Sequence, residues 1–274
     1  MPMRLSTSFV LVTACSLAVS GSVFAQSDAT RVQNNGQTCF NGYGYTLKGG
    51  DYRYTEHHEV SRRNGRITDW NVTYVGRQGQ VIARKHMDFS TNPTVPVYEM
   101  TVPRTGYEEG IRHQGDTWTM FKRASADAKP QTQNFTIDPP MAADSGFNQL
   151  VQQNFSALTS GKTVHFKFAA AGRLSVIDLK ASQTGTPTFE GRPAVQFTAK
   201  LDMFLVNRFV QSLKLTYDPD TKRLLEYEGI GNIPDDDGDV YPVRVSYYSD
   251  MPQVARQHDA PAAACGSVDD NGSG

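Results

Sequence analysis

The sequence predicts a mainly β (α+β) protein, in which a long antiparallel meander forms a strongly curved sheet or incomplete barrel with one amphipathic helix packed on its concave side. Apolar and polar residues alternate with period two in many short segments after residue 51, and turn sequences such as Asn64-Gly65 separate these segments. The segment 145–159 instead has the apolar period of a helix. A long meander tends to curl, and a helix with one apolar stripe needs a surface to cover.

The predicted strands follow one another closely along the chain. The first two lie on either side of Asn64-Gly65, and one carries Tyr52, Tyr54 and Val60. The apolar run 203–210 does not alternate, so strand, buried crossing and short helix all stay open for it. The other predicted strands are 81–89, 97–102, two strands around Ile111 and Trp118, 132–137, 164–168, 174–179, 195–203, 213–217, 225–227 and 243–247.

The first hairpin can form in two registers. A two-residue Asn64-Gly65 loop would place the aromatic residues of the second strand opposite Thr55, His57 and Glu59, which mixes the two faces. A three-residue loop that begins at Arg63 keeps the aromatic side chains on one face, so we predict this loop. It pairs Tyr54 with Tyr74, Glu56 with Val72 and His58 with Trp70.

The predicted helix has recognisable signals at both ends. Asp144 is a residue type that caps helix N-termini, and Gly161 is typical of the residue that follows a helix. Between them lies a single apolar stripe that can face the sheet. The stripe consists of Phe147, Leu150, Val151, Phe155 and Leu158.

The N-terminus has the composition of a secretory signal peptide. Arg4 precedes an apolar stretch, and Val23 and Ala25 occupy the positions where signal peptidase accepts small side chains, so we expect cleavage after Ala25. A second interpretation is a lipoprotein cleavage site that leaves Cys15 lipidated. Either interpretation predicts a periplasmic or secreted protein.

The remaining chain divides by composition. Residues 26–50 are polar and predict an N-terminal arm, residues 51–250 predict one β-rich domain, and residues 251–274 predict a flexible tail. No segment after the leader is apolar over the roughly 20 residues that a transmembrane helix needs. The full chain has a formal net charge of −1, which gives no electrostatic reason to expect nucleic acid as a partner.

Two cysteines remain after the leader is removed. In an oxidising compartment such a pair more often forms a disulfide than stays reduced, so we predict a bond between Cys39 and Cys265. A bridge that closes so long a loop is expected to contribute roughly 2–5 kcal/mol to the stability. Two free thiols are the alternative.

Two motifs suggest chemistry that their context does not support. The segment from Ser160 to Thr163 ends like a phosphate-binding loop, but it follows a helix and precedes a strand, which is the reverse of the order that phosphate capture needs. In Glu56-His57-His58-Glu59, neighbouring side chains on a strand point to opposite faces, so His57 and His58 cannot bind one metal ion together. We therefore predict no cofactor, no metal and no catalytic residue.

Glu56 and His58 remain the most informative polar residues of the predicted sheet. The preferred register places them on the face of Tyr54, Trp70 and Tyr74, where polar groups need partners or contact a ligand. We interpret these five residues as a ligand-binding site at the edge of an aromatic pocket. The alternative is that this face is partly solvated and the two residues have no function.

The order of the leader, the meander and the covering helix resembles the bacterial periplasmic lipoprotein-carrier superfamily, whose half-barrels shelter acyl chains beneath helices. The segment 213–247 is also similar to the ends of uncharacterised secreted β-rich bacterial proteins. The first resemblance implies a non-catalytic binding or carrier protein for an apolar ligand such as a lipid. The alternatives are a structural or assembly protein of the cell envelope that binds another protein, and an unrecognised hydrolase.

Overall fold

The computed structural model describes residues 36–202, 212–234 and 240–256. Every described residue lies in one compact unit, Val32–Gly274. The predicted leader, its cleavage after Ala25, the lipidation of Cys15 and the apolar run 203–210 lie outside the described residues. Cys39 is described but Cys265 is not, so the disulfide between them stays a prediction.

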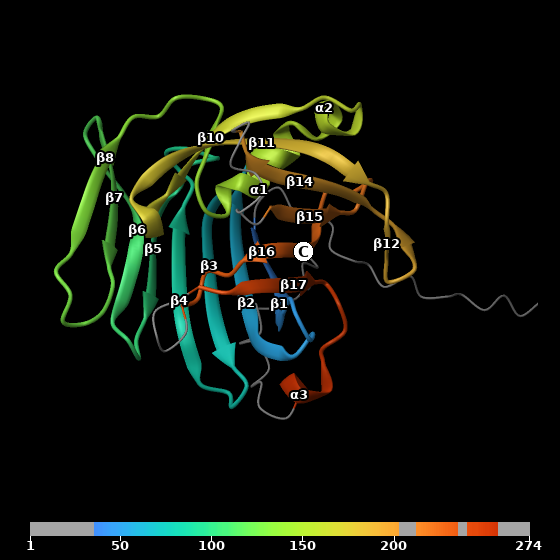
Figure 1. The fold of residues 1–274 in the computed structure, drawn as a ribbon, viewed down its shortest axis with the longest axis horizontal. Coiled ribbons are helices and arrows are strands. Elements are labelled where there is room, and N and C mark those ends of the chain that lie inside the picture. Colours follow the sequence, from blue (N-terminus) through green and yellow to red (C-terminus); the bar gives the residue numbers. More distant parts are fainter. Residues whose placement is uncertain (1–35, 203–211, 235–239, 257–274) are drawn as a thin grey trace, which may run out of the picture. The chain divides into compact units, whose positions relative to one another are not determined.

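The described chain forms one large curved sheet of 15 strands, as the sequence predicts (Figure 1). Its order is β8-β7-β6-β5-β4-β3-β2-β1-β17-β16-β15-β14-β11-β10-β9, and β12 and β13 form a separate two-stranded sheet. All pairs in the large sheet are antiparallel apart from β9 with β10, and β8 and β9 are its two edges. The first eight strands are β1 (Gly36–Thr46), β2 (Tyr52–Arg63), β3 (Arg66–Gly76), β4 (Val81–Asp88), β5 (Val97–Val102), β6 (Tyr107–Gln114), β7 (Thr117–Arg123) and β8 (Gln131–Phe135). The others are β9 (Met141–Ala142), β10 (Val164–Ala170), β11 (Ser175–Gly185), β12 (Thr188–Phe189), β13 (Arg192–Pro193), β14 (Val195–Leu201), β15 (Leu213–Tyr217), β16 (Leu224–Ile230) and β17 (Pro242–Tyr247).

Strand β1 corrects the predicted N-terminal arm. It lies between β2 and β17, so residues 36–46 belong to the middle of the sheet. The glycines that make this segment look like a loop are required by close packing on its inner face. A Cβ at Gly42 would lie 2.6 Å from the ring of Tyr247, and one at Gly44 would lie 2.6 Å from the ring of Tyr54. These two aromatic rings therefore lie directly against the backbone of β1.

The turn between β2 and β3 differs from the predicted one. Arg63 pairs with Arg66, so Asn64 and Gly65 alone form the loop. Both have positive φ, 52° and 74°, as a type I′ turn requires. The predicted three-residue loop is wrong, because Asn-Gly forms the tight turn that suits the twist of a hairpin.

A bulge next to this turn brings the aromatic side chains back to one face. Ser61 pairs with Asp69, while Arg62 pairs with Ile67, so Thr68 is an extra residue in β3. The extra residue reverses the facing that the two-residue loop would otherwise impose. The resulting pairs are Glu56 with Tyr74, His58 with Val72 and Val60 with Trp70, two residues away from the predicted register.

The predicted helix is divided into two short helices. They are α1 (Gly146–Gln153) and α2 (Phe155–Thr159), and the apolar stripe of the pair is buried as predicted. Gly161, with φ 84°, follows α2 as expected. Asp144 is not the N-cap: Ser145 occupies that position, and Asp144 accepts hydrogen bonds from the backbone and hydroxyl of Ser145. Two further short helices are η1 (Ala171–Arg173) and α3 (Gln253–Arg256).

Helices α1 and α2 lie on the inner side of the curved sheet (Figure 1). Phe147 stacks on Phe166 of β10 at 5.2 Å between ring centroids, and Phe155 lies edge-on to Phe197 of β14. The short helix η1, which follows β10, contacts β7 towards the other end of the sheet. The Gly172 carbonyl accepts a hydrogen bond from Lys122 of β7. Side chains from β2–β7 form a second buried cluster on the same concave side.

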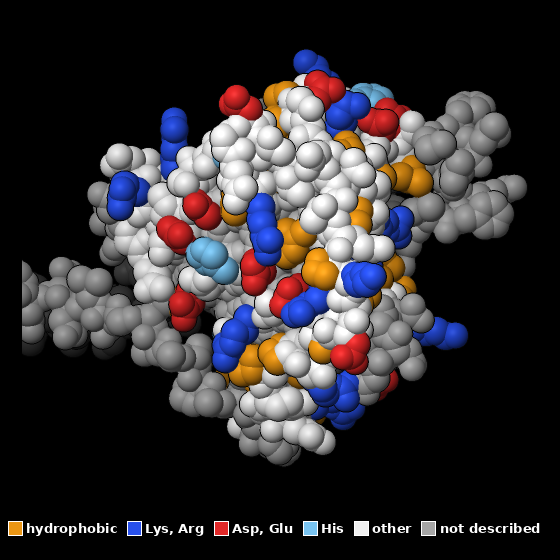
Figure 2. Space-filling model, turned by 90° about the vertical axis from the view of Figure 1, so that its left-hand side faces the viewer, with side chains coloured by type: hydrophobic (Ala, Val, Ile, Leu, Met, Phe, Trp, Pro, Cys, Tyr) orange, Lys and Arg blue, Asp and Glu red, His pale blue; other side chains and the backbone are white. Residues whose placement is uncertain are grey.

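The outer surface carries a mixture of charges. Figure 2 shows the side of the molecule where β7 and β8 lie in Figure 1, and acidic and basic side chains are interspersed there with scattered hydrophobic ones. No large region of one charge sign is visible on this face, in keeping with the small net charge. Within the described ranges, no helix combines the length and the apolar character that crossing a membrane would take.

Candidate functional site

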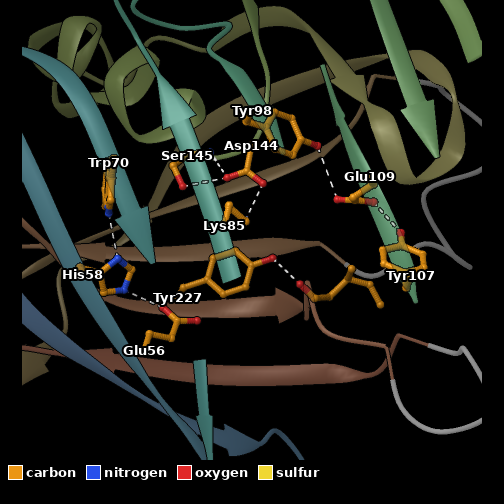
Figure 3. Close-up of polar contacts among 11 residues, drawn as sticks. Glu56, His58, Trp70, Lys85, Tyr98, Tyr107, Glu109, Asp144, Ser145 and Tyr227 are labelled. Atoms are coloured by element: carbon orange, nitrogen blue, oxygen red, sulfur yellow. Dashed lines mark hydrogen bonds and ion pairs between the residues drawn. The ribbon is translucent and has the colours of Figure 1, made fainter. Parts of the chain in front are cut away.

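A cluster of ionisable side chains lies inside the curved sheet (Figure 3). It consists of Glu56 and His58 on β2, Lys85 on β4, Glu109 on β6 and Asp144 in the loop before α1, and we call it the interior ionisable cluster. The strand residues point inward because they alternate with outward-facing neighbours. Burial of ionisable groups is costly unless they are paired or hydrogen-bonded, so each must be accounted for.

His58 is held between two partners. The indole N–H of Trp70 donates a hydrogen bond to His58 Nδ1 at 2.9 Å, and His58 Nε2 lies 2.9 Å from Glu56 Oε2. Because the indole nitrogen can only donate, Nδ1 accepts and the ring proton resides on Nε2, which donates to Glu56. The ring of Phe40 stacks on the imidazole at 4.5 Å and fixes its plane. His58 is therefore in a defined neutral tautomer, and both ring nitrogens are occupied.

Lys85 forms a buried ion pair across the interior. Its ammonium lies 2.7 Å from Asp144 Oδ2, and the exposed fractions of the two side chains are 1% and 7%. The other carboxylate oxygen of Asp144 accepts from the backbone N–H of Ser145 at 2.6 Å. This pair links β4 to the start of α1, so breaking it would leave a buried charge without its partner.

Glu109 is hydrogen-bonded to two tyrosines. The hydroxyl of Tyr107 donates to Oε2 at 2.6 Å, and that of Tyr98 approaches Oε1 at 3.5 Å. Burial raises the pKa of the Glu109 carboxyl, although the Tyr107 hydrogen bond and the charge of Lys85 act in the opposite direction. Gly172 of η1 covers this carboxylate so closely that a Cβ at that position would collide with it.

Four tyrosines surround Glu56. Burial is the largest cause of the raised pKa of Tyr54, Tyr74 and Tyr247, and the charge of Glu56 is the second. Tyr227 on β16 also senses Glu56, after larger effects of burial, Asp144 and Lys85. The rings of Tyr54 and Tyr74 meet edge to face at 5.8 Å. Glu56 is thus a carboxylate inside an aromatic wall contributed by β2, β3, β16 and β17.

Parts of this wall remain accessible to solvent. Tyr227, Tyr247 and Glu109 face the inner side of the sheet, yet each keeps an intermediate exposure. An inward side chain that keeps some exposure can contact a small molecule on the concave side. By contrast, Met87, Met100 and other neighbours are completely buried and belong to the core.

The five residues that the sequence indicates as a ligand site lie together on the inner face. Tyr54, Glu56, His58, Trp70 and Tyr74 are all buried, and His58 connects Glu56 to Trp70. The partial solvation that the alternative interpretation assumes does not apply to these five side chains.

Sequence reasoning missed three of the five residues of the cluster. Lys85 lies between Ala83 and Met87, and Glu109 lies between Tyr107 and Ile111, so both occupy inward positions of alternating strands. The available signal was a charged residue at a strand position where the alternation predicts an inward, apolar side chain. Asp144 carried no comparable signal, because it lies in a loop. In the described part of the chain, no group of three or more His, Cys, Asp or Glu residues is arranged to hold a metal ion.

The fold and the cluster together define a curved-sheet protein with an aromatic, ionisable interior. Comparison with known families and with curated proteins found no family model and no curated protein that matches this chain.

Proposed function

We propose that the protein is a non-catalytic binding or carrier protein that holds an apolar or amphipathic ligand, such as a lipid, on the concave side of its sheet. The observation that carries the proposal is the intermediate exposure of Tyr227, Tyr247 and Glu109, three side chains on the inner face of the sheet. Binding sites for small molecules are mostly apolar and aromatic, with a few polar groups that fix orientation. The interior ionisable cluster supplies such groups.

The hydrogen bonds of the cluster support binding over catalysis. A general base needs a free lone pair within reach of a substrate proton. Both nitrogens of His58 are occupied by Trp70 and Glu56. Lys85 is held by Asp144, and Glu109 is held by Tyr107. These contacts favour a pre-ordered recognition surface over a set of reactive groups.

The proposed place of action is outside the cytoplasm. Its support is the leader-like composition of residues 1–25, with cleavage after Ala25. N-terminal sequencing of the protein recovered from the periplasm and medium of expressing cells tests this proposal. A mature chain that starts at Gln26 supports it, and an uncleaved chain in the cytoplasm contradicts it.

Binding can be tested directly on the purified full-length protein. Organic extraction followed by mass spectrometry should release a bound amphipathic compound, and the fluorescent probe N-phenyl-1-naphthylamine should bind and be displaced by it. Tyr227→Ala should weaken probe binding by about tenfold, because it removes a ring from the inner surface. Glu228→Ala is the matched control, since Glu228 follows on the outer face and pairs with Lys214. No extracted compound together with no probe binding contradicts the proposal.

A second function, capture of another envelope protein, is favoured by the edge strand β8. It pairs only with β7 in the sheet order, and its first four residues are exposed and uncharged. Exposed edges without charges can accept an added strand. If this function holds, Thr132→Pro should abolish capture of an envelope partner, whereas Tyr227→Ala should leave capture unchanged.

A further inference from the structure

We propose that the polar end of the ligand is an organic ammonium group, which pairs with Glu56 and lies against the rings of Tyr227 and Tyr247. This inference rests on the proposed binding function and names the ligand chemistry of the same site. It follows from the charges inside the sheet, taken one at a time.

The charge of His58 depends on whether both of its ring nitrogens carry protons. A histidine can balance a neighbouring carboxylate only when both ring nitrogens carry protons. The Trp70 N–H donates to Nδ1 at 2.9 Å and so keeps a proton off that nitrogen. His58 therefore gives Glu56 a hydrogen bond but no positive charge, although the two lie 2.9 Å apart.

The lysine of the interior ionisable cluster already has a partner. Lys85 is bound to Asp144 at 2.7 Å, so its charge is already matched. Glu56 forms no ion pair with a lysine or arginine in the described chain. Glu109 is paired across β6 and β7 with Lys122, whose charge acts on its carboxyl. Glu56 therefore has no matched cation among the described residues, and a buried carboxylate without a counter-charge costs several kcal/mol. A cationic ligand group would lower that cost.

The aromatic wall beside Glu56 suits a cation. The negative faces of aromatic rings attract cations, and quaternary ammonium groups are commonly held by such rings beside a carboxylate. Tyr74 is paired with Glu56 across β2 and β3. Tyr247 and Glu56 are both matched with Gly42 of β1, from its two sides. The charge of Glu56 also acts on Tyr227. An anionic head group would instead be repelled by Glu56. A metal ion fits less well, since no group of three acidic, histidine or cysteine side chains is found among the described residues.

The test uses the full-length protein and ligands that share one alkyl chain. Decyltrimethylammonium, decyl maltoside and decyl sulfate are titrated below their micelle-forming concentrations, with displacement of N-phenyl-1-naphthylamine as the readout. Decyltrimethylammonium should bind at least about tenfold more tightly than decyl maltoside, and decyl sulfate most weakly. Tetramethylammonium separates the two sources of the cation. Strong displacement by it indicates a free small cation, whereas weak displacement indicates an ammonium that belongs to an amphipathic molecule.

Two variants locate the effect. Glu56→Gln keeps a hydrogen-bond acceptor for His58 but removes the charge, so it should abolish the preference for the cationic ligand and leave decyl maltoside binding within about twofold. Glu59→Gln is the control, because Glu59 lies on the same strand and the opposite face and is half-buried. If Glu56→Gln does not fold, Tyr247→Leu, which should reduce the preference several-fold, takes its place.

The outcomes separate the two proposals. Equal binding of the cationic and neutral ligands by the unmodified protein, or an unchanged preference in Glu56→Gln, overturns the ammonium proposal while probe binding still supports the binding function. No binding of any decyl ligand and no probe binding overturns both. A preference that is lost in Glu56→Gln and kept in Glu59→Gln supports the ammonium proposal.

Discussion

The two ends of the sheet fill the same concave side with different chemistry. On β10, β11, β14 and β15, the inner face is apolar and is covered by α1 and α2, and we call this the apolar half. On β2–β6, the inner face combines aromatic rings with the interior ionisable cluster, and we call this the ionisable half. The apolar half is what helix-on-sheet packing needs for stability. The ionisable half contains groups that stability alone does not require.

This difference separates scaffold from site. Tyr217 illustrates the apolar half: it is fully buried, and its hydroxyl donates to Asn148 of α1 at 3.0 Å. Tyr227, one strand away on β16, keeps an intermediate exposure and senses three charged groups. Neighbouring strands of one sheet thus hold one tyrosine for packing and another beside the proposed ligand surface.

The largest expected effect breaks the apolar half. Phe197→Ala should lower the free energy of unfolding by about 3–5 kcal/mol, because Phe197 is fully buried between Phe155 and Tyr217 and its removal leaves a cavity. Urea unfolding followed by circular dichroism measures it. Val176→Ala, at an exposed position of β11, is the control and should change stability by less than about 0.5 kcal/mol. Similar losses in both variants would contradict the packing described.

The ion pair of the ionisable half should come next. Lys85→Met should destabilise the fold by about 3 kcal/mol, since it leaves Asp144 buried without its cation. Adding Asp144→Asn should recover most of this loss in urea unfolding, because the amide oxygen still accepts from Ser145. Arg84→Met, the exposed neighbour, is the control. A double variant no more stable than Lys85→Met would show that charge matching is not the role of the pair.

A smaller effect is expected at Trp70. Trp70→Phe keeps a ring but removes the donor to His58 Nδ1, so we expect a loss of about 1–2 kcal/mol in urea unfolding. The imidazole can then take a second proton and balance Glu56, which should appear in ¹⁵N NMR spectra of the histidines. Trp118→Phe, beside His113, is the control and should leave the His58 signals unchanged. An unchanged His58 tautomer in Trp70→Phe would contradict the assignment.

The smallest effect concerns Glu109 and depends on pH. Its pKa is raised in the folded protein, so folding favours the protonated acid, and that contribution is lost as the pH rises above about 4.5 through the raised pKa. The free energy of unfolding of Glu109→Gln, followed through its melting temperature, should therefore rise relative to that of the unmodified protein between pH 4 and pH 7, by about 1 kcal/mol or less. Glu108→Gln, which breaks the outer pair with Arg123, should show no such trend. A gain that shrinks with rising pH would reverse the sign and refute the assignment.

Most of the sheet could be predicted because period two is a local property. Residues 97–102 and 213–217 form strands within the predicted bounds, and the apolar stripe of residues 145–159 is buried as expected. The register between β2 and β3 could not be predicted in this way. It depends on the extra residue Thr68, whose carbonyl accepts from the N–H of Phe89 in the neighbouring segment. Tertiary pairing, and not the turn sequence alone, fixes that bulge.

The sequence could predict only the part of the site that lies on the hairpin of β2 and β3. Glu56 and His58 share a face by alternation alone, and the bulge at Thr68 brings Trp70 to that face. Lys85 binds Asp144, which lies 59 positions further along the chain. The charge of Glu56 acts on Tyr227 of β16, which is still more distant in sequence. Such contacts depend on how the sheet curves and on which strands become neighbours. Residues 36–46 show the same limit, because their glycines are explained only by the rings of Tyr54 and Tyr247.

The pairing of β1 with β17 has a consequence for how the molecule is assembled. Gly42 is matched with Tyr247, so the middle of the sheet joins positions about 200 residues apart, and closing so long a loop is entropically slow. A chain that emerges from its N-terminus exposes one hydrogen-bonding edge of β1 until nearly all of the sequence has followed. During that interval the glycine-rich strand offers an unsatisfied backbone ladder to other chains. Truncations that remove β17 should therefore aggregate, whereas those that remove only residues beyond 256 should not.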